Sequence, residues 1–390
     1  MSGIEWCDRS DWNCIRGCTR VSDGCTSCYA EAIAGRFSGP GQPFHGFAKR
    51  TPAGARWTGK VELIAARLTL PLKWRKPARI FVNSAYDLFH ESIPDVWIDR
   101  VFAVMALCPQ HTFQVLTKRS KRMRAWFEEK WQGTPAQTMS FSDGTSIDIP
   151  AGKPTGRRSQ VEQECEPLLQ QFGLADTARD ELWTEDDKCK AMQWRWPLPN
   201  VWLGVSAEDQ PRADERIPDL LATPAAVRFV SGEPMLGLIN PARIAHAGRW
   251  IDAFTGLDEK GIAHFDNGID WVIAGGESGP DARPMHPDWA RSLRDQCVAA
   301  GVAFHFKQWG EWLPWEPEHG PCWVAQDGRS EDHHVLFPVN FDEDQRWDDG
   351  LWAIDGKVGH AAFQRVGKKR AGRLLDGREW NEFPNRKEAT

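Results

Sequence analysis

Three cysteines near the start of the chain have a spacing that suits a metal centre. Cys25 and Cys28 are separated by two residues, so a single turn can present both thiols to one centre. Six residues separate Cys18 from Cys25, and they include the pair Asp23-Gly24, which favours a turn that brings the chain back. Thiolates bind both zinc and iron–sulfur clusters. The spacing therefore predicts a metal centre held by these three residues.

A helix is expected directly after these cysteines. Tyr29, Ile33 and Phe37 recur at intervals of four, which is the spacing of one helix face. The free N–H groups and the dipole at the N-terminus of such a helix favour thiolates and an anionic cluster. The pattern therefore places the start of a helix beside the metal ligands.

The spacing alone leaves the kind of centre open. A structural zinc site needs four ligands, and Cys14 could supply the fourth. A four-cysteine electron-transfer cluster needs the same number, whereas a [4Fe–4S] cluster on three cysteines leaves one iron open to a cofactor or substrate. Thiols without a metal are the remaining alternative. Disulfides are disfavoured, because five of the ten cysteines crowd into the first 28 residues and we expect a reducing compartment.

Polar residues and glycines follow the apolar runs of the sequence. In Gly275-Gly276-Glu277-Ser278 the glycines permit close backbone approach, and the carboxylate can accept hydrogen bonds from an ammonium group. Glu233 follows another apolar run in the same way. We expect cofactor contacts from Gly275, Gly276, Glu277, Ser278, Glu233 and Tyr29. We expect substrate contacts from Asn83, Asp87, His90, Lys118, Arg119, Ser206, Glu208, Lys307 and Gln308.

Six apolar runs predict the strands that position these residues. Their hydrophobicity is nearly continuous, which is typical of strands buried on both faces of a parallel sheet. The runs are Arg79–Asn83, Thr112–Thr117, Asn200–Ser206, Val227–Ser231, Asp270–Gly275 and Val302–Lys307, and a further strand is considered near Val61–Ile64. Helical patterns lie between them at Val96–Leu107 and at Pro287–Ala300, and the second pattern ends at a glycine.

The alternation of strands and helices predicts right-handed βαβ units and an α/β fold. A partial barrel and a doubly wound open sheet both fit this alternation. A barrel enzyme builds its site from the C-terminal ends of many strands, whereas an open sheet concentrates its site at one switch point. Because polar residues follow strand after strand, we favour a partial (β/α) TIM-like barrel of about six parallel strands.

Composition divides the chain into four segments. Residues 1–130 carry the cysteine motif and the first part of the barrel, and residues 198–312 carry the second part. Residues 131–197 are polar and irregular, and we interpret them as an insertion that is partly helical over Val161–Trp183. Residues 313–390 are predicted to form a small C-terminal extension.

Charge and composition narrow the functional classes. A net charge of −6 argues against a protein that coats nucleic acid by bulk electrostatics, although the basic runs Lys118–Arg124 and Lys368–Arg370 could contact phosphate locally. The 21 tryptophans are best explained as core residues. No run of 18 apolar residues and no secretory leader is present, so we expect a cytoplasmic protein that makes no membrane contact. Phosphate-binding loops, nucleophile elbows and zinc-protease motifs are absent, which disfavours hydrolases and nucleoside triphosphatases.

Seven sequence blocks carry a resemblance to a known family. The opening stretch IEWCDRSDWNCIRGCTRVSDGCTSCYAEAIAGRF resembles the start of the bacteriophage-encoded three-cysteine-motif proteins, a family of unknown function. Further matching blocks are FVNSAYDLFHE, FQVLTKR, NVWLGVSAEDQ, RFVSGEPMLG, WVIAGGESGPDARPM and FHFKQWGEW. The resemblance spans most of the chain except residues 131–196.

That family is in turn similar to radical S-adenosylmethionine enzymes, and the similarity implies a function. It implies that Cys18, Cys25 and Cys28 hold a [4Fe–4S] cluster on a partial barrel, with S-adenosylmethionine on the open iron and an electron donor protein as a partner. It also implies that Cys14 is not a ligand, because the family has proline at that position. In the common radical enzymes three and two residues separate the cysteines, whereas here six and two intervene.

Two hypotheses of different classes follow. The first is an iron–sulfur enzyme of phage or prophage type that performs radical S-adenosylmethionine chemistry on a nucleic acid or a nucleotide. The alternative is a non-catalytic, zinc-stabilised binding module that acts on nucleic acid or on a partner protein, with Cys14 as its fourth ligand.

Overall fold

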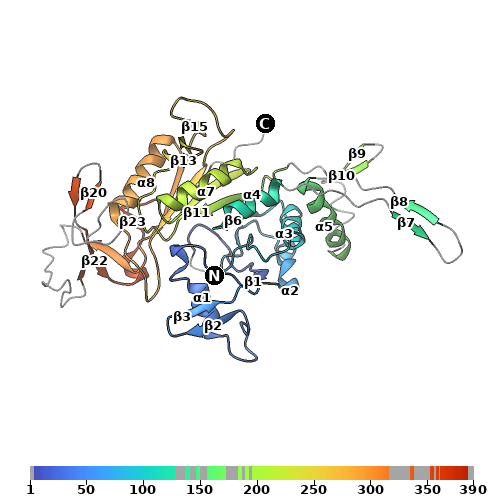
Figure 1. Cartoon of the computed structure of the whole chain (residues 1–390), viewed down its shortest axis with the longest axis horizontal. Coiled ribbons are helices and arrows are strands. Elements are labelled where there is room, and N and C mark those ends of the chain that lie inside the picture. The colour runs from blue at the N-terminus through green and yellow to red at the C-terminus, as the bar shows by residue number, and fades with distance from the viewer. Residues whose placement is uncertain are drawn as a thin grey trace.

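A computed structural model describes most of the chain and provides the geometry used below. It describes residues 4–128, 137–140, 146–149, 156–172, 183–186, 189–192, 196–315, 334–337, 352–354, 357–359 and 361–384. The centre of the molecule is one six-stranded sheet with helices packed on it (Figure 1).

The six strands of this sheet are all parallel and follow one another in chain order. They are β5 (Arg79–Val82), β6 (Thr112–Thr117), β11 (Val201–Ser206), β12 (Val227–Gly232), β16 (Trp271–Gly275) and β17 (Ala303–Gln308). A doubly wound sheet reverses its strand order at a switch point, and this sheet does not. The predicted partial barrel is therefore confirmed, and each predicted strand matches an observed one to within a residue or so at its ends.

Helices cover the outer surface of the curled sheet. They are α3 (Asp95–Ala106), α4 (Ser120–Glu128), α7 (Gln210–Ala222) and α8 (Pro287–Ala300), and their apolar residues share one core with the outward-facing side chains of the strands. The predicted boundaries of α8 are confirmed: His286 accepts a hydrogen bond from the amide of Asp288 at its start, and Gly301 takes a left-handed conformation at its end.

The inner surface of the curled sheet is filled by aromatic side chains, which we call the barrel floor. Its buried members are Trp6, Phe81, Trp202, Val227, Phe229, Trp271 and Ile273. The ring centroids of Trp6 and Phe81 are 4.5 Å apart, and those of Phe229 and Trp271 are 5.6 Å apart. The core role predicted for tryptophan is therefore confirmed for Trp6, Trp202 and Trp271.

Segments from both ends of the chain complete the barrel floor and line the sheet edges. Asp8 and Arg9 donate backbone hydrogen bonds to Arg79 of β5. At the opposite edge, the amide of Phe306 in β17 donates to Trp380, and Phe383 stacks on Trp271 with ring centroids 5.1 Å apart. Residues that are distant in sequence therefore close the inside of the half-barrel together.

Shorter elements surround the sheet. Before β5 lie β1 (Ile15–Arg16), α1 (Tyr29–Arg36), β2 (Ala48–Thr51), β3 (Gly54–Trp57), β4 (Glu62–Leu63) and α2 (Ala65–Leu68), with 3-10 turns at Asp23–Cys25 and Leu70–Lys73. Between β6 and β11 lie β7 (Gln137–Ser140), β8 (Ser146–Ile149), α5 (Arg157–Phe172), β9 (Trp183–Asp186) and β10 (Cys189–Met192). Between β12 and β16 lie β13 (Ile244–His246), β14 (Arg249–Asp252) and β15 (Leu257–Asp258). After β17 come β18 (Trp312–Trp315), β19 (His334–Phe337), β20 (Trp352–Ile354), β21 (Lys357–Gly359), β22 (Ala361–Arg365), α9 (Lys368–Ala371), β23 (Leu374–Leu375) and β24 (Arg378–Glu379).

Two expectations about these shorter elements need correction. The strand considered near Val61–Ile64 exists as β4, but it pairs antiparallel with β1 and does not join the barrel sheet. Of the segment Val161–Trp183, which was expected to be partly helical, the structure describes α5, which begins earlier than expected, at Arg157, and runs to Phe172; residues 173–182 of that prediction lie outside the described residues. The domain boundaries proposed from composition stay predictions.

Candidate functional site

A cavity of about 680 Å³ lies at the C-terminal ends of the barrel strands, directly above the barrel floor. This volume falls within the range of small-molecule sites, roughly 300–1,000 Å³. Fourteen of the eighteen residues predicted for the site line this rim cavity: Cys18, Cys25, Cys28, Tyr29, Asn83, Asp87, Lys118, Arg119, Ser206, Glu233, Gly276, Glu277, Ser278 and Lys307. The structure therefore brings together residues from the cysteine loop and from all six strand ends.

Four predicted residues lie behind the cavity wall instead of lining it. Glu208 is fully buried, and His90 is hydrogen bonded to Thr19 at 3.0 Å. Gln308 donates hydrogen bonds to the carbonyl oxygen of Gly276 at 3.0 Å and to Ser278 at 3.3 Å. Gly275 ends β16 beneath these two residues. The side chains of Glu208, His90 and Gln308 therefore hold the segments that form the wall.

The three cysteines line the cavity from the loop before α1. Cys28 is the residue that precedes the first turn of α1, so the predicted helix start beside these cysteines is confirmed. Burial raises the pKa of the Cys28 thiol, and the amides of Glu31 and Ala30 at the start of the helix oppose that shift. Burial likewise raises the pKa of Cys18 to about 11, against the nearby charge of Arg119. Cys28 adds to the shift of Cys18, and Cys25 adds to that of Cys28, because neighbouring thiolates repel one another.

Cys14 has a different environment from the other three cysteines. Its side chain is fully buried and does not line the rim cavity. Its Sγ lies 3.7 Å from Oδ1 of Asn83, and its amide donates to the same oxygen at 3.0 Å. Cys14 therefore belongs to the packing between β1 and the first strand end.

Arg119 connects the cysteine loop to the first two strand ends. Its guanidinium donates to Asp87 at 3.0 Å, to Glu91 at 2.9 Å and to the hydroxyl of Thr19 at 2.8 Å. One of its nitrogens also lies 3.9 Å from Sγ of Cys18. Arg119 also donates to the carbonyl oxygen of Thr19 at 3.0 Å, so this buried cation ties the cysteine loop to Asp87 and Glu91. Arg119, the second residue of the basic run Lys118–Arg124, is therefore buried and already paired with carboxylates.

A second buried network lies under the turn between Cys18 and Cys25. Glu208 accepts hydrogen bonds from Gly24 at 3.3 Å and from Arg216 at 3.0 Å, and Lys118 lies 3.5 Å away. Burial would raise the pKa of Glu208, but the charges of Lys118 and Arg216 lower it to about 2. A carboxylate from the third strand end thus holds the backbone of the cysteine loop.

The carboxylates of the later strands are paired with basic side chains. Glu277 accepts hydrogen bonds from Arg283 at 2.7 and 2.8 Å, and Arg283 also donates to the carbonyl oxygen of Asp23 at 3.0 Å. Glu233 forms an ion pair with Lys307. The side chain of Glu277 is therefore buried against Arg283 and already paired with a basic group.

Four buried polar groups of residues that line the cavity have no hydrogen-bond partner within the described ranges. They are Nδ2 of Asn83, the hydroxyl of Ser231, Nε1 of Trp6 and Nζ of Lys118, and of these Lys118 lies 3.5 Å from Glu208. Asn83 is 2% exposed and Ser231 is 1% exposed, so bulk water cannot replace the missing hydrogen bonds of either side chain. An unpaired buried donor costs about 1–3 kcal/mol. These atoms therefore suit a ligand with polar groups of its own.

Comparison with known proteins places the chain in a family. The model of a family described as a protein of unknown function, DUF5131, matches residues 1–384. The chain belongs to the DUF5131 family. No curated protein and no solved structure matches it.

For this DUF5131 chain, the described residues also bear on metal binding and on membranes. They contain no group of three or more His, Cys, Asp or Glu side chains arranged to hold a metal ion. The cysteines whose side chains are described are free thiols. None of the described helices has the length and apolar character needed to cross a membrane.

Some residues that line the DUF5131 cavity, or support its wall as Arg283 does, were not among the predicted site residues. Arg283 pairs with Glu277, and Thr19 holds Arg119, but each is a single polar residue in a loop with no local pattern. Lys368 reaches the cavity from α9 and lies 3.6 Å from Glu5. The basic run at Lys368–Arg370 is the one signal in the sequence that pointed to this contribution.

Proposed function

We propose that the chain is an iron–sulfur enzyme whose Cys18, Cys25 and Cys28 hold a [4Fe–4S] cluster and whose rim cavity binds S-adenosylmethionine for radical chemistry. The observation that carries this proposal is the shared cavity: three cysteines and polar residues from the ends of six parallel strands line one volume, and Cys14 does not. A site at the C-terminal ends of barrel strands is where barrel enzymes keep their chemistry.

The set of donors fits a cluster better than a single ion. A structural zinc ion needs four ligands around one point, and Cys14 is occupied by its contacts with Asn83. In a cluster each thiolate binds a different iron, so the sulfur atoms stand farther apart than they do around one ion.

When bound, the cluster and S-adenosylmethionine supply a one-electron cleavage that generates a carbon radical, and this chemistry belongs to the cofactors. The chain itself orients the reactants. Nδ2 of Asn83 and the hydroxyl of Ser231 offer hydrogen bonds to a bound ligand, and Lys307 and Glu233 offer one charge of each sign. Arg119 and Glu208 fix the cysteine loop from below, so that the thiols keep their position when a ligand enters.

The wider assignment belongs to the same proposal. The sequence blocks that resemble phage three-cysteine-motif proteins, and through them radical S-adenosylmethionine enzymes, support a phage or prophage origin. Such an enzyme would work in the cytoplasm with an electron donor protein, and its substrate would be a nucleic acid or a nucleotide. The zinc-stabilised binding module is not favoured by any contact of Cys14.

Anaerobic purification and reconstitution test the proposal. We expect about four iron and four sulfide ions per chain, a broad brown absorption band, and release of 5′-deoxyadenosine after chemical reduction with S-adenosylmethionine present. Substitution of Cys18, Cys25 or Cys28 by alanine abolishes the band. The matched control Cys14→Ala keeps it, because Cys14 lies outside the cavity.

Three outcomes would contradict the proposal. One is a zinc ion on each chain with no uptake of iron. Another is loss of the metal in Cys14→Ala to the same degree as in Cys25→Ala. A cluster that forms but never yields 5′-deoxyadenosine would reject the radical chemistry and leave an iron–sulfur protein of another kind.

A further inference from the structure

A strongly basic segment lies next to the rim cavity in a chain that is acidic overall. Residues 36–79 contain ten lysines and arginines and one acidic residue, whereas the whole chain has 48 basic and 54 acidic residues. This segment includes β2, β3, β4 and α2, and in Figure 1 the hairpin β2–β3 lies below α1 (blue) and projects away from the central sheet. The positive charge is therefore concentrated in one region of the molecule.

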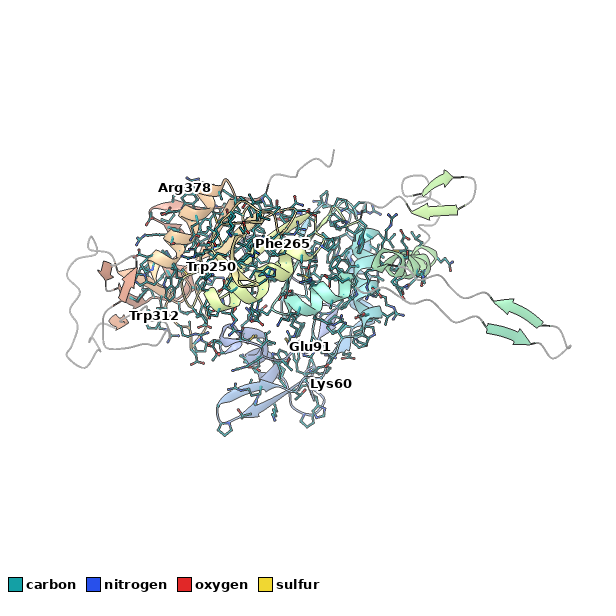
Figure 2. The ribbon with its side chains drawn as sticks, turned by 45° about the horizontal axis from the view of Figure 1, so that its top comes forward. Lys60, Glu91, Trp250, Phe265, Trp312 and Arg378 are labelled. Carbon is teal, nitrogen blue, oxygen red and sulfur yellow. The ribbon has the colours of Figure 1, made fainter. Side chains whose placement is uncertain are left out.

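Most of these cations have no carboxylate partner. Among the described residues, Arg79 lies 3.1 Å from Asp8 and Arg56 lies 3.9 Å from Glu31, and no other cation of the segment reaches a carboxylate. We use the term basic region for four exposed residues of this kind: Arg36, Lys49, Lys60 and Arg67. Lys60 is labelled on the projecting part in Figure 2. Several unpaired cations in one segment of an acidic chain favour an anionic partner.

The basic region is fixed to the cysteine loop and not loosely attached. Gly35 of α1 packs so closely on Ala55 of β3 that a Cβ at Gly35 would lie 2.3 Å from that of Ala55. The buried carboxylate of Glu31 accepts a hydrogen bond from the amide of Trp57 at 2.8 Å and pairs with Arg20 of the cysteine loop. A partner held by this region is therefore held in a fixed relation to the cavity.

Aromatic side chains continue from the basic region to the cavity. Phe37 is 41% exposed beside Arg36, and Tyr29, at the cavity mouth, is 55% exposed. Trp57 of β3 contacts Tyr86, another cavity residue, with ring centroids 5.8 Å apart. Burial raises the pKa of the Tyr86 phenol and the charge of Arg67 opposes that shift, so Arg67 lies close to the same wall.

We propose that the basic region and these aromatic residues bind a single-stranded segment of nucleic acid and lead it to the rim cavity. Phosphates along a strand match several separated cations, and exposed aromatic faces stack on unpaired bases. The role of this strand as the substrate rests on the proposed function, whereas its binding does not. An anionic membrane surface would use the cations but has no planar groups for Phe37, Tyr29 and Trp57.

Fluorescence anisotropy with labelled single-stranded DNA and RNA oligonucleotides of mixed sequence tests the proposal. The protein is used without added iron, so the result does not depend on the cluster. We expect binding that weakens steeply with salt. In the variant Arg36→Ala/Lys49→Ala/Lys60→Ala/Arg67→Ala we expect at least about tenfold weaker binding and a salt slope smaller by up to about three, since each lost phosphate contact on a single strand removes about 0.7. The DNA and RNA arms decide which polymer is bound.

Matched controls separate this effect from general loss of charge. Lys121→Ala/Lys260→Ala removes two exposed lysines outside the segment and is expected to bind like the native chain. Phe37→Ser is expected to weaken binding about fivefold without changing the salt slope, because it removes a stacking surface. Circular dichroism and iron content of the quadruple variant should equal those of the native chain.

Several results would overturn the inference. Equal binding by the native chain and the quadruple variant would do so, as would equal loss in the lysine control. Preference for duplex over single strands, or for phosphatidylserine vesicles over oligonucleotides, would assign the region to a different partner. If binding is confirmed but no cluster forms, the proposed function fails and the nucleic-acid surface stands.

Discussion

The barrel floor and the rim cavity are built from the same strands but with opposite chemistry. In β12, Phe229 is part of the floor, and Ser231, two residues later on the same side of the sheet, lines the cavity. Phe229 packs between the rings of Trp6 and Trp271, whereas the hydroxyl of Ser231 is buried with no partner in the described part of the chain. The floor therefore contributes to stability, and the rim keeps polar groups that cost stability and serve a ligand.

The largest expected effect comes from removing the central ring of the floor. Trp271→Ala deletes contacts with Trp6, Trp202, Phe229 and Phe383, so the free energy of unfolding should fall by about 3–5 kcal/mol in denaturant titrations. Trp250→Ala is the control, since Trp250 is 39% exposed, and it should cost much less. If the two variants lose the same free energy of unfolding, the barrel floor does not contribute more to stability than an exposed tryptophan does.

Acid should act on the floor through His305. Burial, together with the charges of Arg373, Lys307 and Arg79, lowers the pKa of His305 from 6.5 to about 3. As the pH falls below 6.5, His305 is therefore protonated in the unfolded chain, whereas in the folded chain it stays neutral until about pH 3. This contribution to stability is complete above pH 6.5 and is lost as the pH falls toward 3, at up to about 1.4 kcal/mol per pH unit.

The variant His305→Phe isolates this effect. Both ring nitrogens of His305 lack hydrogen-bond partners among the described residues, and the ring lies against Trp271 and Phe383, so phenylalanine is expected to fit. Its unfolding midpoint should depend less on pH between 6.5 and 4 than that of the native chain. If the unfolding midpoint of the variant depends on pH as strongly as that of the native chain, His305 does not cause the loss of stability in acid.

A smaller loss is expected from crowding the floor. A Cβ on Gly204 would lie 2.5 Å from the ring of Phe229, so Gly204→Ala should cost about 1–3 kcal/mol in thermal or denaturant unfolding. Gly156→Ala is a suitable control, because nothing lies within 4 Å of its added Cβ. If Gly204→Ala unfolds like the native chain, the floor is packed more loosely than described.

The smallest change in stability is expected at the rim. Ser231→Ala removes a buried hydroxyl that has no partner among the described residues, so unfolding should be unchanged or shifted toward stability by about 1 kcal/mol or less. Binding of S-adenosylmethionine to the reconstituted protein, measured by equilibrium dialysis, should weaken in the same variant. A clear loss of stability without any loss of binding would make Ser231 a structural residue.

The sequence predicted the sheet well because its information is local. Apolar runs such as Thr112–Thr117 and Val201–Ser206 are strands wherever they are buried, and the polar residues that follow them had to gather at one rim. The helix after Cys28 was also predicted from local periodicity, yet Tyr29, Ile33 and Phe37 are exposed. Periodicity thus identified the helix, although not which of its faces is buried.

Contacts between distant residues could not be predicted in the same way. Trp6 and Phe383 are single aromatic residues without a local pattern, and their place in the barrel floor follows only from the folded chain. The sequence likewise gave no partner for Arg119 or Glu277, although both ion pairs decide which charges remain available to a ligand. The small sheet β13–β15 between β12 and β16 was missed because its strands are short and half-exposed.

A barrel with six strands is left with two open margins, and exposed strand margins invite pairing with other chains. Here Asp8 and Arg9 occupy the margin of β5, and residues 380–382 occupy that of β17. Each edge of the sheet is thus covered by a short segment of the same chain. The rim cavity can therefore stay open to a ligand while neither sheet edge offers its backbone to neighbouring molecules as a template for aggregation.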